Sequence, residues 1–148
     1  MRGTGEDSTA ISLPQISGSQ GGERVARAPV FPTDRKLRRD LKTLATFIGI
    51  YCGERHADVE KQAVCMKSHD VTRIAGRPVT LCPSCTKLLM HAFVKRTSCP
   101  YNPKPACKHC QSHCYHNQYR DQIREVMRYS GKRLVLSGRL DYFFKLLF

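Results

Sequence analysis

Apolar positions recur with helical periodicity in three stretches of the chain. The first stretch follows Thr33 and Asp34, either of which can cap a helix, and we expect it to end at Gly53, since glycine is common at helix C-termini. Its apolar positions alternate between four-residue and three-residue spacing, which places them on one face of an amphipathic helix. They are Leu37, Leu41, Leu44, Ile48 and Tyr51.

The second stretch is predicted to begin near Pro83, because proline suits the first turn of a helix. The residues that continue at helical spacing in this stretch are Leu88, Leu89, Ala92, Phe93 and Arg96. The third stretch predicts an amphipathic helix that starts at Tyr115 and closes at Gly131. Its helical positions are Tyr115, Tyr119, Ile123, Val126, Met127 and Ser130.

The remaining segments are less regular. Residues 57–80 stay unassigned, apart from a turn at Ala75-Gly76-Arg77-Pro78. Apolar residues from Leu134 to Phe148 suggest a terminal helix packed on the others, whereas residues 1–32 are rich in Gly, Pro, Ser and Thr without apolar periodicity. The pattern therefore predicts a mostly α-helical fold: a disordered tail over residues 1–32, then one small helical domain over residues 33–148 with metal-stapled cysteine loops.

The residues between Cys99 and Cys114 contain the closest cluster of potential metal ligands in the sequence. Four of the eight cysteines fall in this stretch with the spacing C-x7-C-x2-C-x3-C, and prolines prevent its first part from being helical. In a reducing compartment, such clustered cysteines more often bind metal than form a disulfide framework. We interpret the stretch as a metal-ligand loop.

Two four-ligand sites can be drawn from the sequence. The first set consists of Cys52, His56, Cys82 and Cys85. The second consists of Cys99, Cys107, Cys110 and Cys114. Spacing leaves another pairing open, in which the hooks Cys82/Cys85 and Cys107/Cys110 share one ion as in a zinc ribbon. His56 is included because the first set otherwise has only three ligands, whereas His109, His113 and His116 are not needed as ligands.

The residues do not determine which metal is bound. Zinc suits tetrahedral sites of thiolates and imidazoles, but C-x2-C-x3-C also comes close to an iron–sulfur cluster motif. A thiol redox protein is a further alternative, although its C-x2-C motif normally lies in a βαβ unit. The chain has no phosphate-binding glycine loop, dinucleotide motif or nucleophile elbow, so we expect no catalytic residues and do not expect an enzyme.

The net charge is +13, and the basic excess lies after the tail. A positive domain suggests an anionic partner, either nucleic acid or an acidic protein. The N-terminus lacks the apolar region of a signal peptide, and no apolar run is long enough to span a membrane. We therefore expect a cytoplasmic protein, and the sequence does not determine its oligomeric state.

Several motifs together resemble one known family. They are Tyr51-Cys52, Leu81-Cys82-Pro83-Ser84-Cys85, Arg96 with Cys99-Pro100, Lys104-Pro105-Ala106-Cys107-Lys108-His109-Cys110, His113-Cys114-Tyr115 and Ile123-Arg124-Glu125-Val126-Met127-Arg128-Tyr129-Ser130-Gly131. Over about Arg35 to Phe148 the chain resembles the nitrous oxide-stimulated promoter family of small bacterial proteins. Compared with that family, the stretch from Ala57 to Thr80 is longer than usual, so Cys65 is not expected to be a site residue.

The resemblance implies a small cytoplasmic protein linked to denitrification or nitrosative stress, but no catalytic residue comes with it. We expect a metal-binding protein, with zinc or an iron–sulfur cluster, in an accessory or regulatory role. Two alternatives remain: a basic, nucleic-acid-binding zinc protein that acts in transcription, and a thiol or cluster redox protein.

Overall fold

The computed structural model describes residues 31–138 except His113, and over these residues the fold is mostly helical, as the sequence predicts. The elements follow the order α1 (Arg35–Arg55), β1 (Gln62–Ala63), α2 (Val71–Ala75), β2 (Thr80–Leu81), α3 (Pro83–Thr97) and α4 (Asn117–Leu136). A single 3-10 turn, Cys107–His109, lies in the loop between α3 and α4. The predicted tail therefore lies outside the described residues, except for Phe31 and Pro32.

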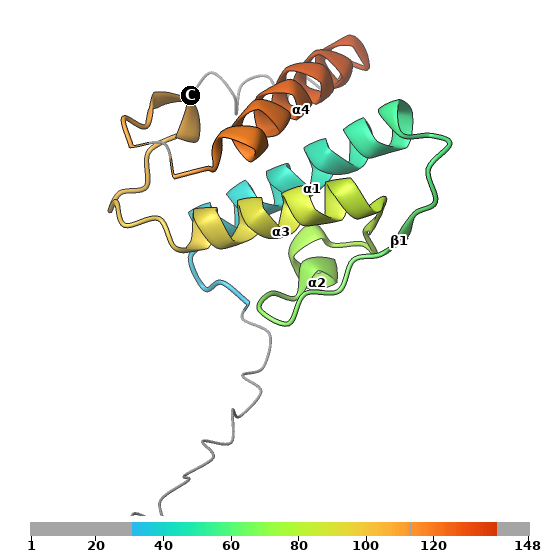
Figure 1. Ribbon diagram of the computed structural model, residues 1–148. Coiled ribbons are helices and arrows are strands. Elements are labelled where there is room, and N and C mark those ends of the chain that lie inside the picture. The colour runs from blue at the N-terminus through green and yellow to red at the C-terminus, as the bar shows by residue number, and fades with distance from the viewer. Residues whose placement is uncertain (1–30, 113, 139–148) are drawn as a thin grey trace, which may run out of the picture.

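Helix α1 is the centre of the arrangement, because α2, α3 and α4 all pack against it (Figure 1). In Figure 1, α1 and α3 lie side by side, with α4 above them and α2 below. Strands β1 and β2 form a two-stranded antiparallel sheet in which Gln62 is opposite Leu81. This sheet brings the chain back to the end of α1 just before α3 begins.

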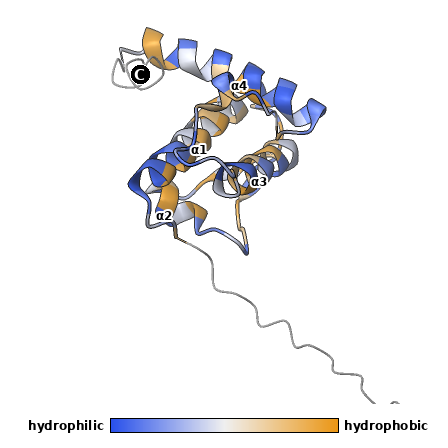
Figure 2. Ribbon diagram, turned by 90° about the vertical axis from the view of Figure 1, so that its left-hand side faces the viewer, coloured by the Kyte–Doolittle hydropathy of each residue, from blue (hydrophilic) through white to orange (hydrophobic). Residues whose placement is uncertain are grey.

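The core forms where the apolar faces of α1, α3 and α4 meet. Figure 2 shows hydrophobic residues on the inner sides of these helices and hydrophilic residues on much of the outer side of α4. The largest fully buried apolar side chains are Phe47, Phe93, Leu41, Ile48, Leu81, Leu89 and Val126. Full burial of a side chain of this size contributes about 1.5–3 kcal/mol, so these contacts hold the three long helices together.

Two predicted helix ends are wrong, and both predictions relied on a glycine. Helix α1 continues through Gly53 to Arg55, and α4 begins at Asn117 and continues through Gly131 to Leu136. Gly131 is buried on the inner face of α4. The glycine with positive φ comes later, at Gly138, where φ is 76°. Packing against the core therefore keeps the buried Gly131 helical despite its weak helix propensity, whereas Gly53 is exposed and is carried within α1 beside the buried Cys52.

The helix starts agree better with the sequence. Asp34 caps α1, since its carboxylate accepts a hydrogen bond of 2.9 Å from the backbone N–H of Lys36. Helix α3 begins at Pro83 as predicted. The predicted turn after residue 75 is also present, because Gly76 ends α2 in the left-handed region with φ of 75°.

The structure assigns the segment that the sequence left open, and it corrects the predicted terminal helix in part. Residues 57–80 contain β1 and α2. Leu134 to Leu136 belong to α4, whereas the rest of the predicted terminal helix lies outside the described residues. None of the helices described is both long and apolar enough to cross a membrane.

Candidate metal centre

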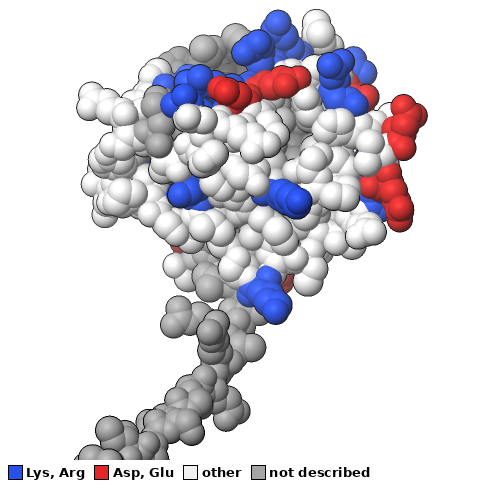
Figure 3. All heavy atoms as spheres, viewed as in Figure 1, with Lys and Arg blue, Asp and Glu red and all other residues white. Residues whose placement is uncertain are grey.

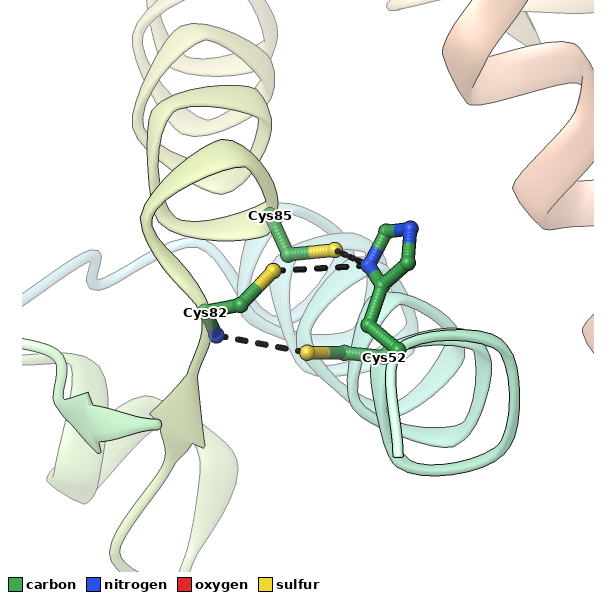
Figure 4. Close-up of side chains that lie close together, drawn as sticks. Cys52, Cys82 and Cys85 are labelled. Atoms are coloured by element: carbon green, nitrogen blue, oxygen red, sulfur yellow. Dashed lines mark hydrogen bonds between the residues drawn. The ribbon is translucent and has the colours of Figure 1, made fainter. Parts of the chain in front are cut away.

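One group of metal-ligating side chains lies where the end of α1 meets the start of α3 (Figure 4). Cys52 is in the last turn of α1, and His56 is its C-cap residue, so the two side chains lie one helical turn apart on the same side. Cys82 is the N-cap of α3 and Cys85 lies in its first turn. The C-x2-C hook thus starts one helix while the Cys52/His56 pair ends another.

The donor atoms of these four residues all lie within 4.8 Å of one another. Nδ1 of His56 lies 3.2 Å from Sγ of Cys85 and 3.4 Å from Sγ of Cys82. In a tetrahedral zinc site, bond lengths of about 2.3 Å to sulfur and 2.0 Å to nitrogen give a sulfur–nitrogen separation of about 3.5 Å. The two observed sulfur–nitrogen distances are therefore close to those of a tetrahedral site for one ion.

The sulfur atoms of the group are buried and lie close to hydrogen-bond donors, which suits them to bind a metal ion. Cys52, Cys82 and Cys85 are 0%, 1% and 3% exposed, and His56 is half-buried. The backbone N–H of Cys82 donates to Sγ of Cys52 over 3.3 Å, as Figure 4 shows. The hydroxyl of Ser84 lies 3.2 Å from Sγ of Cys82. Donors directed at sulfur stabilise the thiolate, which is the form that binds metal.

The three thiols differ in acidity. Burial raises the pKa of Cys52 and, more strongly, that of Cys85. Burial also opposes ionisation of Cys82, but hydrogen bonds from Ser84, Cys85 and Cys52 outweigh it and lower the pKa of Cys82 to about 6. Cys82 is thus the thiol that is ionised most readily at neutral pH, and binding of a metal would drive the other two to release protons.

Helix α4 borders the group on its accessible side. The ring of Tyr51 meets His56 edge-on, with 5.5 Å between the ring centroids, and its hydroxyl donates to Glu125 of α4 over 2.8 Å. A depression of about 230 Å³ lies beside the group and is lined by His56, Cys85 and residues of α4 such as Glu125. The group is therefore covered by protein on most sides but reachable from this depression.

The second predicted set lies at the other end of α3. Cys99, Cys107, Cys110 and Cys114 all line one small cavity together with Arg96 and Tyr115. Within the part of the chain that the structure describes, however, only the first set has its donor atoms gathered closely enough to hold an ion. Binding of a metal by the second set therefore remains a prediction, and the structure shows that its four cysteines share a cavity.

The loop that carries the second set is tied to α3 by two basic residues. Arg96 donates to the carbonyl of Pro105 over 2.8 Å, and its guanidinium also pairs with Asp40 of α1. The ammonium of Lys104 donates to the carbonyls of Thr97 and Cys99, over 3.0 and 3.3 Å. These bonds hold the loop against the C-terminus of α3, where cations are favourable.

The thiols of the loop are close enough to influence one another. Although residue Cys107 as a whole is exposed, its thiol lines the cavity, and desolvation raises its pKa. Like charge on Cys114, Cys99 and Cys110 adds to the rise in pKa, whereas the guanidinium of Arg96 opposes it. A metal ion bound there would relieve this repulsion between thiolates.

The structure shows which side chains of the pairings left open by the sequence lie close together. Cys82 and Cys85 face Cys52 and His56, and they do not share a group with Cys107 and Cys110. Cys65 is exposed and lies outside the group, whereas His113 is outside the described residues.

Some supporting residues were not recognised from sequence. The hydroxyl of Ser84 in the Cys-Pro-Ser-Cys hook was a usable signal, since a hydroxyl next to the first cysteine can reach its sulfur. The contacts of Tyr51 with Glu125 and of Asp40 with Arg96 had no comparable signal, because these pairs form through packing between helices. The edge-on contact of Tyr51 with His56 is local to the end of α1.

These features define a small helical protein in which three cysteines and one histidine lie close together where the ends of two helices meet. The family described as nitrous oxide-stimulated promoter matches residues 35–141, and the chain belongs to this family. No curated protein and no solved structure matches the chain.

Proposed function

We propose that this protein binds a metal ion through Cys52, His56, Cys82 and Cys85 and serves an accessory or regulatory role in the response to nitrosative stress or in denitrification. The observation that carries the proposal is the closeness of the four donor atoms, all within 4.8 Å of one another in a buried junction between α1 and α3. Zinc is the ion that this set of ligands suits best, because it favours four thiolate and imidazole ligands.

The loop between α3 and α4 supplies the second site of the proposal. Its four cysteines, Cys99, Cys107, Cys110 and Cys114, line a common cavity next to Arg96. Four thiolates can hold either zinc or an iron–sulfur cluster, so the two sites need not carry the same metal.

The link to nitrosative stress combines the family description with the chemistry of the site. Thiolates are the form of cysteine that undergoes S-nitrosylation, and Cys82 is the thiol whose pKa is lowered, to about 6. Modification of a thiolate removes a metal ligand. Loss of the ion would then loosen the α1–α3 junction, which gives the protein a way to convert chemical damage into a structural change.

The test compares the metal content of Cys82→Ser and Cys65→Ser with that of the wild-type protein, all purified without oxygen. Both variants exchange sulfur for oxygen, but Cys82 belongs to the group and exposed Cys65 does not. We expect Cys82→Ser to lose about one metal ion per chain and Cys65→Ser to keep the full content. Colourless protein with zinc supports zinc at both sites, and brown protein with iron and sulfide supports a cluster in the loop.

A nitrosating donor added to the wild-type protein tests the role in nitrosative stress. We expect release of metal to a chromogenic chelator, with the same yield in Cys65→Ser. Equal metal content in Cys82→Ser and wild-type protein would contradict the metal site. Retention of metal after complete nitrosylation of the accessible thiols would contradict the stress role while leaving the metal site intact.

A further inference from the structure

Basic residues form a row along the outer face of α4. They occur at every fourth position, which in a helix gives neighbouring side chains one turn apart. The row begins with Arg120, which is half-buried and has its Nε shielded from solvent, and continues with Arg124, Arg128 and Lys132. The last three are exposed, whereas the opposite face of α4 carries the buried residues Val126, Ser130 and Leu134.

Few acidic groups oppose this row. Arg124 has an ion pair with Asp121 at 3.8 Å, and both side chains are largely exposed, so the pair neutralises little. For Arg128 and Lys132, the described residues provide no ion pair. Glu125, the other carboxylate of α4, instead accepts the hydroxyl of Tyr51 on the side that faces α1.

Glu54, the other carboxylate near α4, lies at the end of α1 and is also held by residues of α4. Glu54 accepts hydrogen bonds from Tyr129 at 2.6 Å and from Arg133 at 2.8 Å. These hydrogen bonds hold the carboxylate of Glu54 at the α1–α4 contact rather than on the outer face of α4. The row therefore remains positively charged.

Such a row is unfavourable for the isolated helix. Like charges four residues apart repel one another, and the row contains three such pairs in succession. The first turn of α4 has no acidic residue to complement the positive end of the helix dipole, and its N-cap residue, His116, makes no side-chain capping bond. A polyanion placed along the outer face would offset the repulsion between these like charges.

We propose that the outer face of α4 binds the phosphate backbone of nucleic acid. The exposed part of the row, from Arg124 to Lys132, advances about 12 Å along the helix, which corresponds to roughly three or four phosphates at 3.4 Å per nucleotide along one DNA strand. Figure 3 shows Lys and Arg gathered along the upper edge of the molecule, where α4 lies, with Asp and Glu side chains among them, whereas Lys and Arg are scattered singly below it. The net charge of +13 provides the long-range attraction. This interaction goes beyond the proposed metal-dependent role and does not depend on it.

The experiment measures binding of the full-length, metal-loaded protein to a DNA duplex of about 20 base pairs between roughly 50 and 200 mM salt. The test variant is Arg128→Gln/Lys132→Gln on α4. The matched control is Lys67→Gln/Arg77→Gln, which removes the same charges from exposed positions on either side of α2, a helix that packs against α1. Circular dichroism confirms that both variants are folded.

Phosphate contacts release counterions, so each lost contact lowers the slope of log affinity against log salt by about one. We expect the α4 variant to lower the slope by about two and to weaken binding at low salt at least tenfold, while the control stays within twofold of wild type. Equal losses in both variants, or no binding of the wild-type protein at about 50 mM salt, would overturn the proposal. So would displacement of DNA by polyglutamate at the same concentration of negative charge, because that result indicates an acidic protein as partner.

Discussion

His69 is a buried histidine outside the metal centre. Its Nδ1 lies 2.9 Å from the hydroxyl of Ser68, its Nε2 lies 2.9 Å from that of Thr97, and its ring packs edge-on against Phe93. Burial lowers its pKa below the ordinary value for histidine. The folded protein therefore favours the neutral ring, and protonation works against the fold.

This burial predicts the direction of one pH effect. Because the folded-state pKa is lowered, the stabilisation from neutral His69 is present above the unfolded pKa of about 6.5 and is lost as the pH falls toward the folded value. We expect the free energy of unfolding to fall more steeply between pH 7 and pH 5 in the wild-type protein than in His69→Asn. Urea unfolding at several pH values, with metal content followed in parallel, measures the difference. Parallel curves for the two proteins would show that His69 does not titrate with folding.

At the scale of elements, a partly buried ion pair between Arg96 and Asp40 joins α1, α3 and the cysteine loop. Nε of Arg96 donates to Asp40 over 3.0 Å, and another nitrogen of the same guanidinium donates to the carbonyl of Pro105. Arg96 is 6% exposed, so its charge needs both partners. The candidate metal centre lies at the opposite end of the same antiparallel α1–α3 pair, so the ion pair and the Cys/His group lie at opposite ends of the contact between the two helices.

Removal of Asp40 should lower the free energy of unfolding, because it leaves Arg96 without its carboxylate partner. Asp40→Ala leaves the guanidinium of Arg96 buried with one partner fewer, and we expect a loss of about 2–3 kcal/mol in the free energy of unfolding. The control is Asp121→Ala, which breaks the exposed pair with Arg124 and should change stability by less than about 0.5 kcal/mol. Chemical denaturation measures both, and similar values for the two variants would contradict the role of the pair between Arg96 and Asp40.

At the scale of the whole molecule, the helical domain is predicted to be independent of the N-terminal tail. Phe31 is already in contact with it, since the guanidinium of Arg73 lies 4.1 Å from the centre of its ring. A truncation that tests the domain boundary should therefore end at Val30 and keep Phe31.

Deletion of residues 1–30 should leave metal content and melting temperature unchanged, because this segment has no periodic apolar residues to bury. Calorimetry and metal analysis of the truncated and complete chains provide the comparison. A fall of more than a few degrees in melting temperature would mean that the tail packs against the domain, and that the predicted boundary at residue 32 is wrong.

The sequence by itself was sufficient for features that depend on near neighbours. The spacing of Leu37, Leu41 and Leu44 predicted α1, Asp34 marked its start, and Pro83 marked the start of α3. Helical periodicity, caps and proline act within one or two turns, so they can be recognised along the chain. The pairing of Cys52 with His56 is equally local, because four residues make one helical turn.

Only the tertiary structure decided what depends on contacts between distant segments. It kept the buried Gly131 inside α4, since packing against the core outweighs the preference of glycine for helix ends, and it extended α1 past the exposed Gly53. It brought Asp40 to Arg96. It also placed the Cys82/Cys85 hook opposite the end of α1, where spacing alone allowed a shared ion with the later cysteines. The antiparallel packing of α1 and α3 determines which ligands meet, and that packing is a property of the buried faces of both helices.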